Sequence, residues 1–295
     1  MAVKTVKNQE RAAKAALTKR SLQKFMKNKM ACAGIIVLFT IVVSCICAPL
    51  LTDWDPALID MASASLAPGE EGHLLGTDRM GRDMFARLLY GGRWALFLGV
   101  TASVCTHTFA AILGVLAGYF GGIVDRIIVT SAEMVALFPT TLLFILLAAV
   151  TGRSITVVLV VWILTGWGGT MRITRSKIMS LRQEPFVESC RANGISNTSI
   201  MFHHIIPNTL GPIILNMTSA VGGFILREAG LSYLNIGLPP DIPTWGNIVT
   251  DARRVDILLD QMELWVYPGI VMLCVVLSIN FIGDGLRDAL DATTK

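Results

Sequence analysis

Residues 182–208 read RQEPFVESCRANGISNTSIMFHHIIPN and form a polar island between two long apolar runs. Pro185 suits the first turn of a helix, because the N–H group that proline lacks has no partner there. Gly194 stands where a helix often ends in a left-handed conformation. Ser196 can cap a second helix that leads to Pro207. The island therefore predicts a helix, a glycine turn and a second helix.

The first of these helices carries both charged and apolar side chains. Glu188 and Arg191 lie three residues apart and can pair on one face. Phe186 and Val187 belong to a segment that we expect to face water. Two interpretations of this apolar pair stay open. It plugs a groove of another protein, or it rests on the membrane surface as part of a solvated loop.

The composition is that of an integral membrane protein. The 295 residues are 53% hydrophobic and 16% charged, with a mean hydropathy of +0.62, whereas soluble domains are about 25% charged. Since about 20 apolar residues span a bilayer as a helix, we expect an all-α protein with six transmembrane helices. The apolar runs lie near residues 31–51, 95–118, 127–150, 155–171, 205–227 and 265–283.

Basic residues indicate the orientation of these runs. Residues 1–30 carry nine Lys or Arg and one acid, which fits either a tail that lies on anionic lipid or a retention signal. With the amino terminus inside the cell, the inner segments hold 17 of the 25 basic residues. This bias follows the positive-inside rule, so we expect a cytoplasmic amino terminus and a cytoplasmic island at 182–208.

The fifth apolar run is unusually polar for a membrane helix. Its polar side chains either line a polar pathway through the protein or form hydrogen bonds with neighbouring helices. We favour the pathway. The candidate residues are Asn208, Asn216, Thr218 and Ser219.

Small and charged residues in the second and third runs indicate contacts between helices. Gly114 and Gly118 form a GxxxG pair, which predicts a close approach of another helix. Glu133 follows Arg126 early in the third run. It either lies at the cytoplasmic edge of the bilayer or pairs with Arg126, and we favour a structural ion pair.

Several motifs are absent from the sequence. It contains no GxxxxGK[ST] phosphate loop, no nucleophile elbow, no HExxH and no CxxC. Five of the six cysteines lie in apolar runs, so no disulfide framework or zinc site is expected. No aromatic residues alternate with basic ones, as a nucleic-acid platform requires. We therefore expect no enzyme activity, no cofactor, no metal site and no nucleic acid, with energy supplied by a partner or an ion gradient.

The island resembles the EAA loop of ABC-importer permeases, in which a helix couples the membrane subunit to an ATPase. The resemblance rests on Glu188, Gly194 and Ile206 with Pro207, whereas Ser189 and Cys190 replace the usual pair of alanines. By this resemblance, the residues that dock on the ATPase are Phe186, Val187, Glu188, Ser189, Cys190, Gly194 and Pro207.

Two strings outside the island resemble a narrower family, the C-type permeases of dipeptide, oligopeptide and nickel importers. One is GTDRMGRD, followed by YGGR, in the first outer loop, and the other runs from EAGLSYLNIG to PTWGN in the last outer segment. The family residues in these strings are Gly76, Thr77, Asp78, Gly81, Arg82, Asp83, Arg93, Trp245 and Gly246.

The resemblance implies a type I ABC importer permease fold in the cytoplasmic (inner) membrane. It divides the chain into a basic cytoplasmic tail (1–30), a first transmembrane helix (31–51), an extracytoplasmic loop (52–92), a five-helix permease core (93–284) and a second cytoplasmic tail (285–295).

The implied partners are a second homologous but unlike permease, two ATPase subunits on the cytoplasmic face and an extracytoplasmic substrate-binding protein. The implied cargo is a dipeptide or oligopeptide. Three alternatives stay open: the same machine importing nickel or a chelated metal, an ion-coupled secondary transporter that works alone, and a structural membrane subunit without a pathway.

Overall fold

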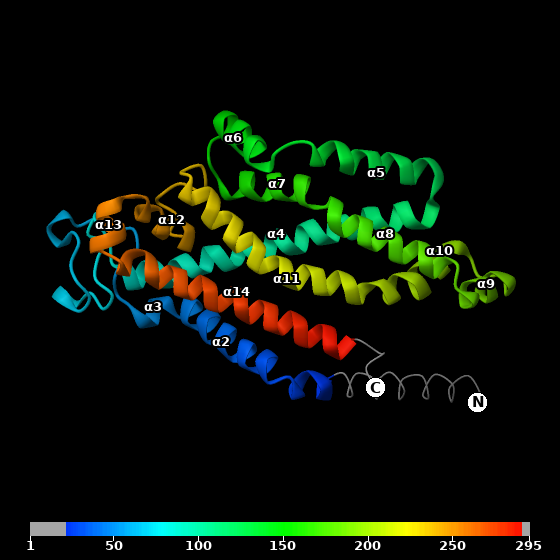
Figure 1. Ribbon diagram of the computed structural model, residues 1–295, viewed down its shortest axis with the longest axis horizontal. Helices are drawn as coiled ribbons and strands as arrows, with labels where there is room; N and C mark the ends of the chain where they lie inside the picture. The colour runs from blue at the N-terminus through cyan, green and yellow to red at the C-terminus, as the bar shows by residue number, and fades with distance from the viewer. Residues whose placement is uncertain (1–21, 291–295) are drawn as a thin grey trace.

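The computed structural model describes residues 22–290, and this part of the chain is helical without a named strand (Figure 1). The amino-terminal tail up to residue 21 and residues 291–295 lie outside the described residues. The main helices are α2 (Lys29–Ile46), α3 (Ala48–Leu51), α4 (Met84–Phe120), α5 (Gly122–Ala136), α6 (Thr140–Thr151), α7 (Ile155–Gly166), α8 (Gly168–Arg182), α9 (Pro185–Ala192), α10 (Asn197–Ile200), α11 (Ile206–Tyr233), α12 (Trp245–Val249), α13 (Val255–Asp260) and α14 (Glu263–Leu290). Four single-turn segments complete them: η1 (Met61–Ser63), η2 (Glu70–Gly72), the π-helical η3 (Met201–Ile205) and η4 (Thr250–Arg253).

The helices are consistent with six membrane spans, although two of the expected spans are broken. In the described part of the chain, four helices are long and apolar enough to cross a membrane, or up to six if each of two bent pairs is one span. The pair α5 and α6 bends by 79°, and the pair α7 and α8 bends by 41°. The apolar run at 127–150 thus contains a break between two helices. Pro139 explains this break, because proline ends the preceding helix and tolerates only a new first turn.

The second span is the inner part of a longer helix. We placed its apolar run at 95–118, and α4 begins at Met84 and continues for 37 residues. Asp83 caps this helix, because its Oδ1 accepts a hydrogen bond of 2.6 Å from the backbone N–H of Ala86. The boundary at residue 93 between outer loop and core thus falls inside α4.

Glycines bring α4 and α8 together, as the GxxxG pair predicted. A Cβ atom at Gly114 would lie 2.7 Å from the carbonyl oxygen of Met171, and one at Gly118 would lie 2.7 Å from that of Arg175. Neither distance is tolerated by a real side chain. The absence of a side chain therefore fixes how closely the two helices pack.

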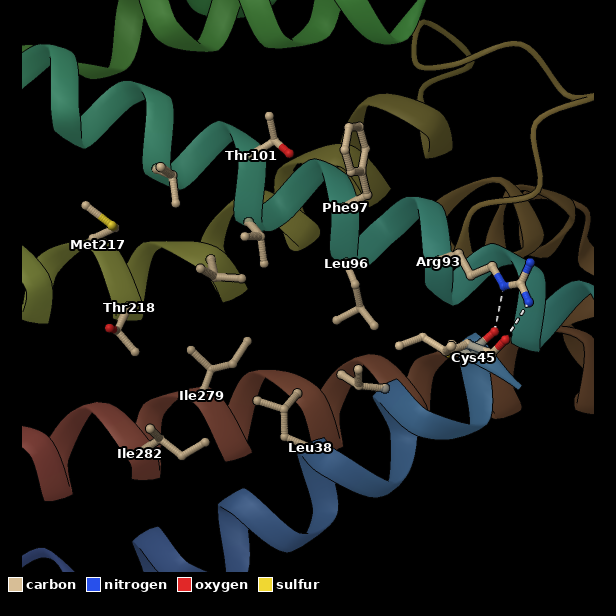
Figure 2. A pocket seen from close by; sticks show the side chains of 15 residues that line it. Leu38, Cys45, Arg93, Leu96, Phe97, Thr101, Met217, Thr218, Ile279 and Ile282 are labelled. Carbon is tan, nitrogen blue, oxygen red and sulfur yellow. Dashed lines mark hydrogen bonds between the residues drawn. The ribbon is translucent and has the colours of Figure 1, made fainter. Parts of the chain in front are cut away.

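The first span, α2, lies along α14, and both border an apolar groove with α4 and α11 (Figure 2). The groove has a volume of about 590 Å³. At one end, Arg93 of α4 donates hydrogen bonds to the carbonyl oxygens of Cys45 (2.6 Å) and Ile46 (2.7 Å). Arg93 thus binds the last carbonyls of α2, which have no partner within their own helix.

Candidate functional site

The predicted coupling helix, α9, lies at one end of the molecule, beyond the bundle (Figure 1). The outer loop with α12 and α13 lies at the opposite end (Figure 1). A partner that binds α9 therefore contacts the face opposite to the one that carries the GTDRMGRD string.

Local sequence signals build α9 and its turn. Pro185 occupies the first turn, as predicted. Gly194 has φ +75°, and its N–H group donates to the carbonyl oxygen of Arg191 at 2.9 Å. The N–H group of Ile195 donates to the carbonyl oxygen of Cys190 at 3.1 Å. These two bonds form a Schellman motif, which requires a left-handed residue at Gly194.

The expectation that Phe186 and Val187 form an exposed apolar pair was wrong for one of them. Phe186 is 37% exposed, but Val187 is fully buried. Val187 packs in a cluster that contains Ile178 of α8 and Ile200 of α10. Since α9 is amphipathic, neighbouring residues point in different directions. Val187 holds α9 on the bundle, and Phe186 remains available to a partner.

Charged and polar residues of α9 point mostly to the surface. Glu188 and Ser189 are exposed, and Cys190 is half-buried against the same cluster as Val187. The Ser189 hydroxyl donates to the carbonyl oxygen of Pro185 within the helix. The expected pair of Glu188 with Arg191 is not among the ion pairs of the described residues. The Glu188 carboxylate is therefore free to meet a partner's cation.

Two residues clamp the turn to the end of α4. The Tyr119 hydroxyl donates to the carbonyl oxygen of Asn197 at 2.8 Å. Arg182 donates to the carbonyl oxygen of Tyr119 at 2.9 Å, with its guanidinium 5.9 Å from the centre of the Tyr119 ring. A groove of about 580 Å³ opens beside this clamp and is lined also by Arg191 and Gly194. Its two arginines make it basic.

Pro207 lies where α11 begins, directly after a π-helical turn. In this turn, the N–H group of Ile206 bonds the carbonyl oxygen of Met201, five residues earlier. Such wide turns occur often at functional sites. The helix from Asn197 to Tyr233 is nevertheless long and apolar enough for one span. The segment that follows the Gly194 turn is thus continuous with α11.

An ion pair joins two other helices, but it uses residues different from those expected. Two guanidinium nitrogens of Arg175 in α8, Nε and Nη2, donate hydrogen bonds to the carboxylate of Asp125 in α5. Glu133, for which we favoured a structural pair with Arg126, is exposed and has no ion pair within the described chain. The Asp125–Arg175 pair connects the two bent spans.

The four polar residues of α11 do not share one environment. At about 100° per residue, Asn216 and Thr218 lie about 200° apart around the helix axis. Thr218 lines the apolar groove of Figure 2, and its hydroxyl bonds the carbonyl oxygen of Ile214 within α11. Asn208 likewise bonds the carbonyl oxygen of His204. Ser219 is exposed, next to Gly283 of α14.

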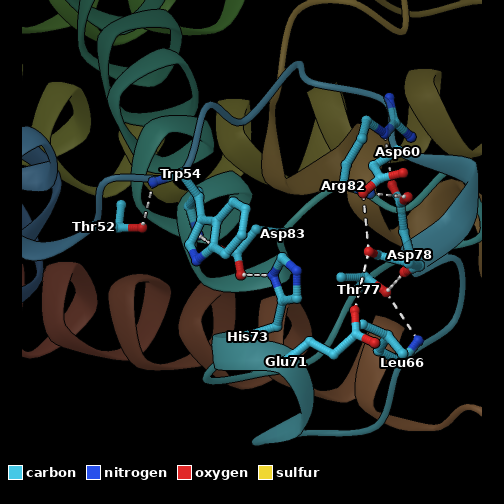
Figure 3. A network of polar contacts seen from close by, with 12 residues as sticks. Thr52, Trp54, Asp60, Leu66, Glu71, His73, Thr77, Asp78, Arg82 and Asp83 are labelled. Atoms are coloured by element: carbon cyan, nitrogen blue, oxygen red, sulfur yellow. Dashed lines mark hydrogen bonds and ion pairs between the residues drawn. The ribbon is translucent and has the colours of Figure 1, made fainter.

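The GTDRMGRD string folds the outer loop onto itself (Figure 3). Thr77 donates to the carbonyl oxygen of Ser63 at 2.5 Å and accepts from the N–H group of Leu66 at 2.9 Å. Asp78 accepts from Arg82 Nε at 2.7 Å. Thr77 and Asp78 are each only 2% exposed. These side chains stabilise the loop from inside, so Arg82 does not extend freely to the membrane interface.

Two glycines of the same string permit close backbone contacts. Gly76 has φ +74° and Gly81 has φ +73°. A Cβ atom at Gly81 would lie 1.6 Å from the carbonyl oxygen of Asp60. Only glycine fits there, since it combines positive φ with the absence of a side chain.

The PTWGN string attaches α12 to two long helices. The indole N–H of Trp245 donates to the carbonyl oxygen of Leu88 in α4 at 2.9 Å. Gly246 faces α11, where a Cβ atom would lie 2.6 Å from Cα of Ala229. The family residues Trp245 and Gly246 are therefore packing residues at the outer end of the bundle.

Comparison with known proteins decides the family. The family model described as a binding-protein-dependent transport system inner membrane component matches residues 110–295. This chain belongs to that family. A second model, described as the N-terminal transmembrane domain of oligopeptide transport permease C, matches residues 16–68 of this permease.

Relatives of the permease cover nearly its whole length. It is 37% identical to a dipeptide transport system permease protein of Alkalihalophilus pseudofirmus, over 94% of this chain and 90% of the relative. It is 34% identical to a putative peptide permease protein of Brucella suis, over 92% and 90% of the two chains. It is 32% identical to an oligopeptide transport system permease protein of Bacillus subtilis, over 93% and 89%.

Sequence reasoning missed three residues that organise this permease. Tyr119 and its clamp carry no local signal, because the bond to Asn197 joins positions 78 residues apart. His73 bonds Asp83 at 2.8 Å and stacks on Trp54 with ring centroids 4.1 Å apart (Figure 3). Glu228 belongs to the EAGLSYLNIG string, which indicates the family but not the role of this carboxylate.

Glu228 is a buried carboxylate that joins α11 to the turn before α12. It is 1% exposed, and its Oε1 accepts hydrogen bonds from Ser232 (2.7 Å) and Thr244 (2.8 Å). An acidic residue followed four positions later by serine is a signal for such a bond. Buried carboxylates need such donors, because burial without them is costly.

Proposed function

We propose that this permease is a subunit of an ATP-driven ABC importer and forms half of the translocation pathway for dipeptides and oligopeptides. Its partners are a second, unlike permease, two ATPase subunits at the α9 end and a substrate-binding protein at the opposite end. The amino terminus lies on the cytoplasmic side of the inner membrane. The dipeptide and oligopeptide permeases among its relatives support the cargo.

The observation that carries the proposal is the construction of the α9 turn. Phe186 and Glu188 are exposed on α9, and Glu188 has no ion pair among the described residues. Val187 packs α9 on the bundle, and the bonds of Tyr119 and Arg182 tie the segments on either side of α9 to α4. Movement of a docked ATPase reaches α4 through Tyr119, and it reaches α11 through the π-helical turn. Closure of the ATPases on ATP thereby shifts the spans between two arrangements.

The proposal also assigns residues that dock on the ATPase and residues that line the pathway. Docking uses Phe186, Glu188, Ser189 and the Gly194 turn, whereas Val187, Cys190 and Pro207 support them. In the pathway we retain Asn216, and Asn208 lies nearer the α9 end of the same helix. Residues 93–284 are proposed as the permease core, with α4 extending it to Met84.

The experiment uses the transporter purified from its native membrane with its partner chains. Subunits are identified by mass spectrometry, and uptake of a labelled tripeptide into proteoliposomes is measured with ATP inside and binding protein outside. Uptake that needs ATP, and that Glu188→Lys abolishes together with ATPase recovery, supports the proposal. Uptake driven by an ion gradient, or of nickel in place of peptide, would overturn it. Glu184→Lys is the matched control, since Glu184 is exposed but precedes the helix.

A further inference from the structure

A pocket of about 580 Å³ lies between α6, α7 and the outer half of α11. Its wall contains the hydroxyl side chains of Thr140, Thr141 and Thr165, the ring of Trp162 and the guanidinium group of Arg227. Sites for small ligands typically have about 300–1,000 Å³ and a few polar groups in an otherwise apolar wall. The pocket has the size and the mixed lining of such a site.

Among the described residues, the cation of this pocket has no counterion. Arg227 is exposed and forms no ion pair within the described chain, although its guanidinium lies 5.1 Å from the centre of the Phe224 ring. The neighbouring Glu228 does not neutralise it, because that carboxylate is buried and bonds Ser232 and Thr244. Arg227 belongs to a helix that is long and apolar enough to cross a membrane. A charged residue at such a position usually faces a water-filled path and has a function.

Helical spacing places Arg227 above a polar residue on the same face. Arg227 follows Asn216 by eleven residues, which is about three turns. Gly223 and Gly230 fall near the same face, and a Cβ atom at either would meet nothing within 4 Å. There is therefore free space beside α11 at Gly223 and Gly230. Asn216 and Arg227 lie on the same face as these glycines, and Arg227 also lines the pocket.

We propose that this pocket binds the C-terminal carboxylate of the peptide during its passage, with Arg227 as the main contact. The inference rests on the proposed function and adds a substrate site to it. The guanidinium group matches a carboxylate with two parallel N–H donors. Thr140 and Thr141 supply further hydroxyl donors to the pocket, whereas the hydroxyl of Thr165 already bonds the carbonyl oxygen of Val161 within α7. Trp162 and Leu231 leave an apolar wall for a side chain.

This site does not depend on the amino-acid sequence of the peptide, because every unmodified peptide ends in a carboxylate. The guanidinium is exposed and therefore screened by water. Such a contact orients a peptide and still releases it. A transporter that carries many peptides needs a site with these two properties.

The test uses the intact transporter with its partner chains, reconstituted without the binding protein so that delivery does not select the peptide. The probe is a tripeptide with benzoylphenylalanine in the middle position, as the free acid or the C-terminal amide. After illumination, mass spectrometry identifies the labelled helices. We expect labels on α6, α7 or α11, with the amide labelling roughly tenfold less at limiting concentration, as expected for one lost charge-assisted contact.

Variants separate the role of Arg227 from that of general charge. Arg227→Gln should reduce labelling by the free acid to the level of the amide, and Arg227→Lys should retain part of the difference. Arg153→Gln is the matched control, because Arg153 is an exposed arginine in the turn between α6 and α7, outside the pocket. It should keep the difference of the unaltered protein.

The outcomes separate a failure of this inference from a failure of the proposed function. If the unaltered transporter imports peptide with ATP and binding protein, but labels equally with acid and amide, this inference is wrong and the proposed function stands. The same holds if Arg227→Gln changes only the lipid that copurifies. The comparison of acid with amide uses the unaltered transporter. It therefore tests the inference even if the Arg227→Gln variant fails to assemble. If the transporter imports no peptide at all, both proposals fail.

Discussion

Tyr119, at the end of α4 nearest α9, donates its hydroxyl proton to the backbone carbonyl of Asn197 across 2.8 Å. Asn197 opens the first helix after the Gly194 turn. The bond therefore joins the turn to a helix of 37 residues, which is about 55 Å long. A displacement at α9 has a rigid path toward the outer end of the bundle.

Tyr119→Phe should weaken coupling without unfolding the permease. The change removes one hydrogen bond, worth about 1 kcal/mol, but keeps the ring beside Arg182. We expect peptide uptake per ATP hydrolysed to fall several-fold at unchanged abundance in the membrane. Uptake and ATP hydrolysis are measured on the same proteoliposomes. Tyr233→Phe is the control, because Tyr233 is 43% exposed and lies at the end of α11 that is far from the Gly194 turn. If the two variants have equal ratios of peptide uptake to ATP hydrolysis, Tyr119 has no role in coupling.

Replacing Gly194 should test the conformation of the turn rather than the space around it. No atom lies within 4 Å of a Cβ placed at Gly194, whereas its φ is +75°. A β-branched residue is strained there by about 1–2 kcal/mol, and asparagine tolerates positive φ better. Gly194→Asn should retain most of the uptake, and Gly194→Val should lose most of it at normal abundance. If both variants lose uptake equally, filling of the adjacent basic groove is the cause.

The glycine turn was predictable from the sequence because its determinants are local. Pro185, Gly194 and Ser196 each act through their own backbone or through residues at most four positions away. The burial of Val187 was not predictable in the same way. It depends on Ile178 and Ile200, which α8 and α10 bring to it. Periodicity over eight residues could show that α9 has two faces, but not which one the bundle covers.

The outer loop shows the same limit at longer range. The string GTDRMGRD identified its residues without revealing that Thr77 and Asp78 point inward. Thr77 donates to the carbonyl oxygen of Ser63, which lies 14 residues earlier in the chain. The pocket beside Arg227 was likewise hidden, because its other walls come from α6 and α7.

Phe186 and Val187 should respond oppositely to the same substitution. Val187→Asp buries an unpaired carboxylate in an apolar cluster, so we expect low abundance and rapid proteolysis of the loop. Phe186→Asp leaves the fold intact, because that ring is partly exposed, but it weakens ATPase recovery in affinity purification. Abundance and copurified ATPase are quantified on the same membranes. Normal abundance of Val187→Asp would contradict the burial of Val187.

Asp83 should matter more for the outer loop than its single charge suggests. Its carboxylate caps α4 through Ala86 and also bonds His73, which stacks on Trp54. Asp83→Ala removes the cap and one buried hydrogen bond, together about 2–3 kcal/mol. The loop then opens more often. Trypsin added outside right-side-out vesicles should therefore cleave much faster after Arg79, which is exposed. Asp53→Ala is the control, since Asp53 is an exposed acid of the same loop. Equal cleavage rates for the two variants would show that the His73–Asp83 contact does not hold the loop closed.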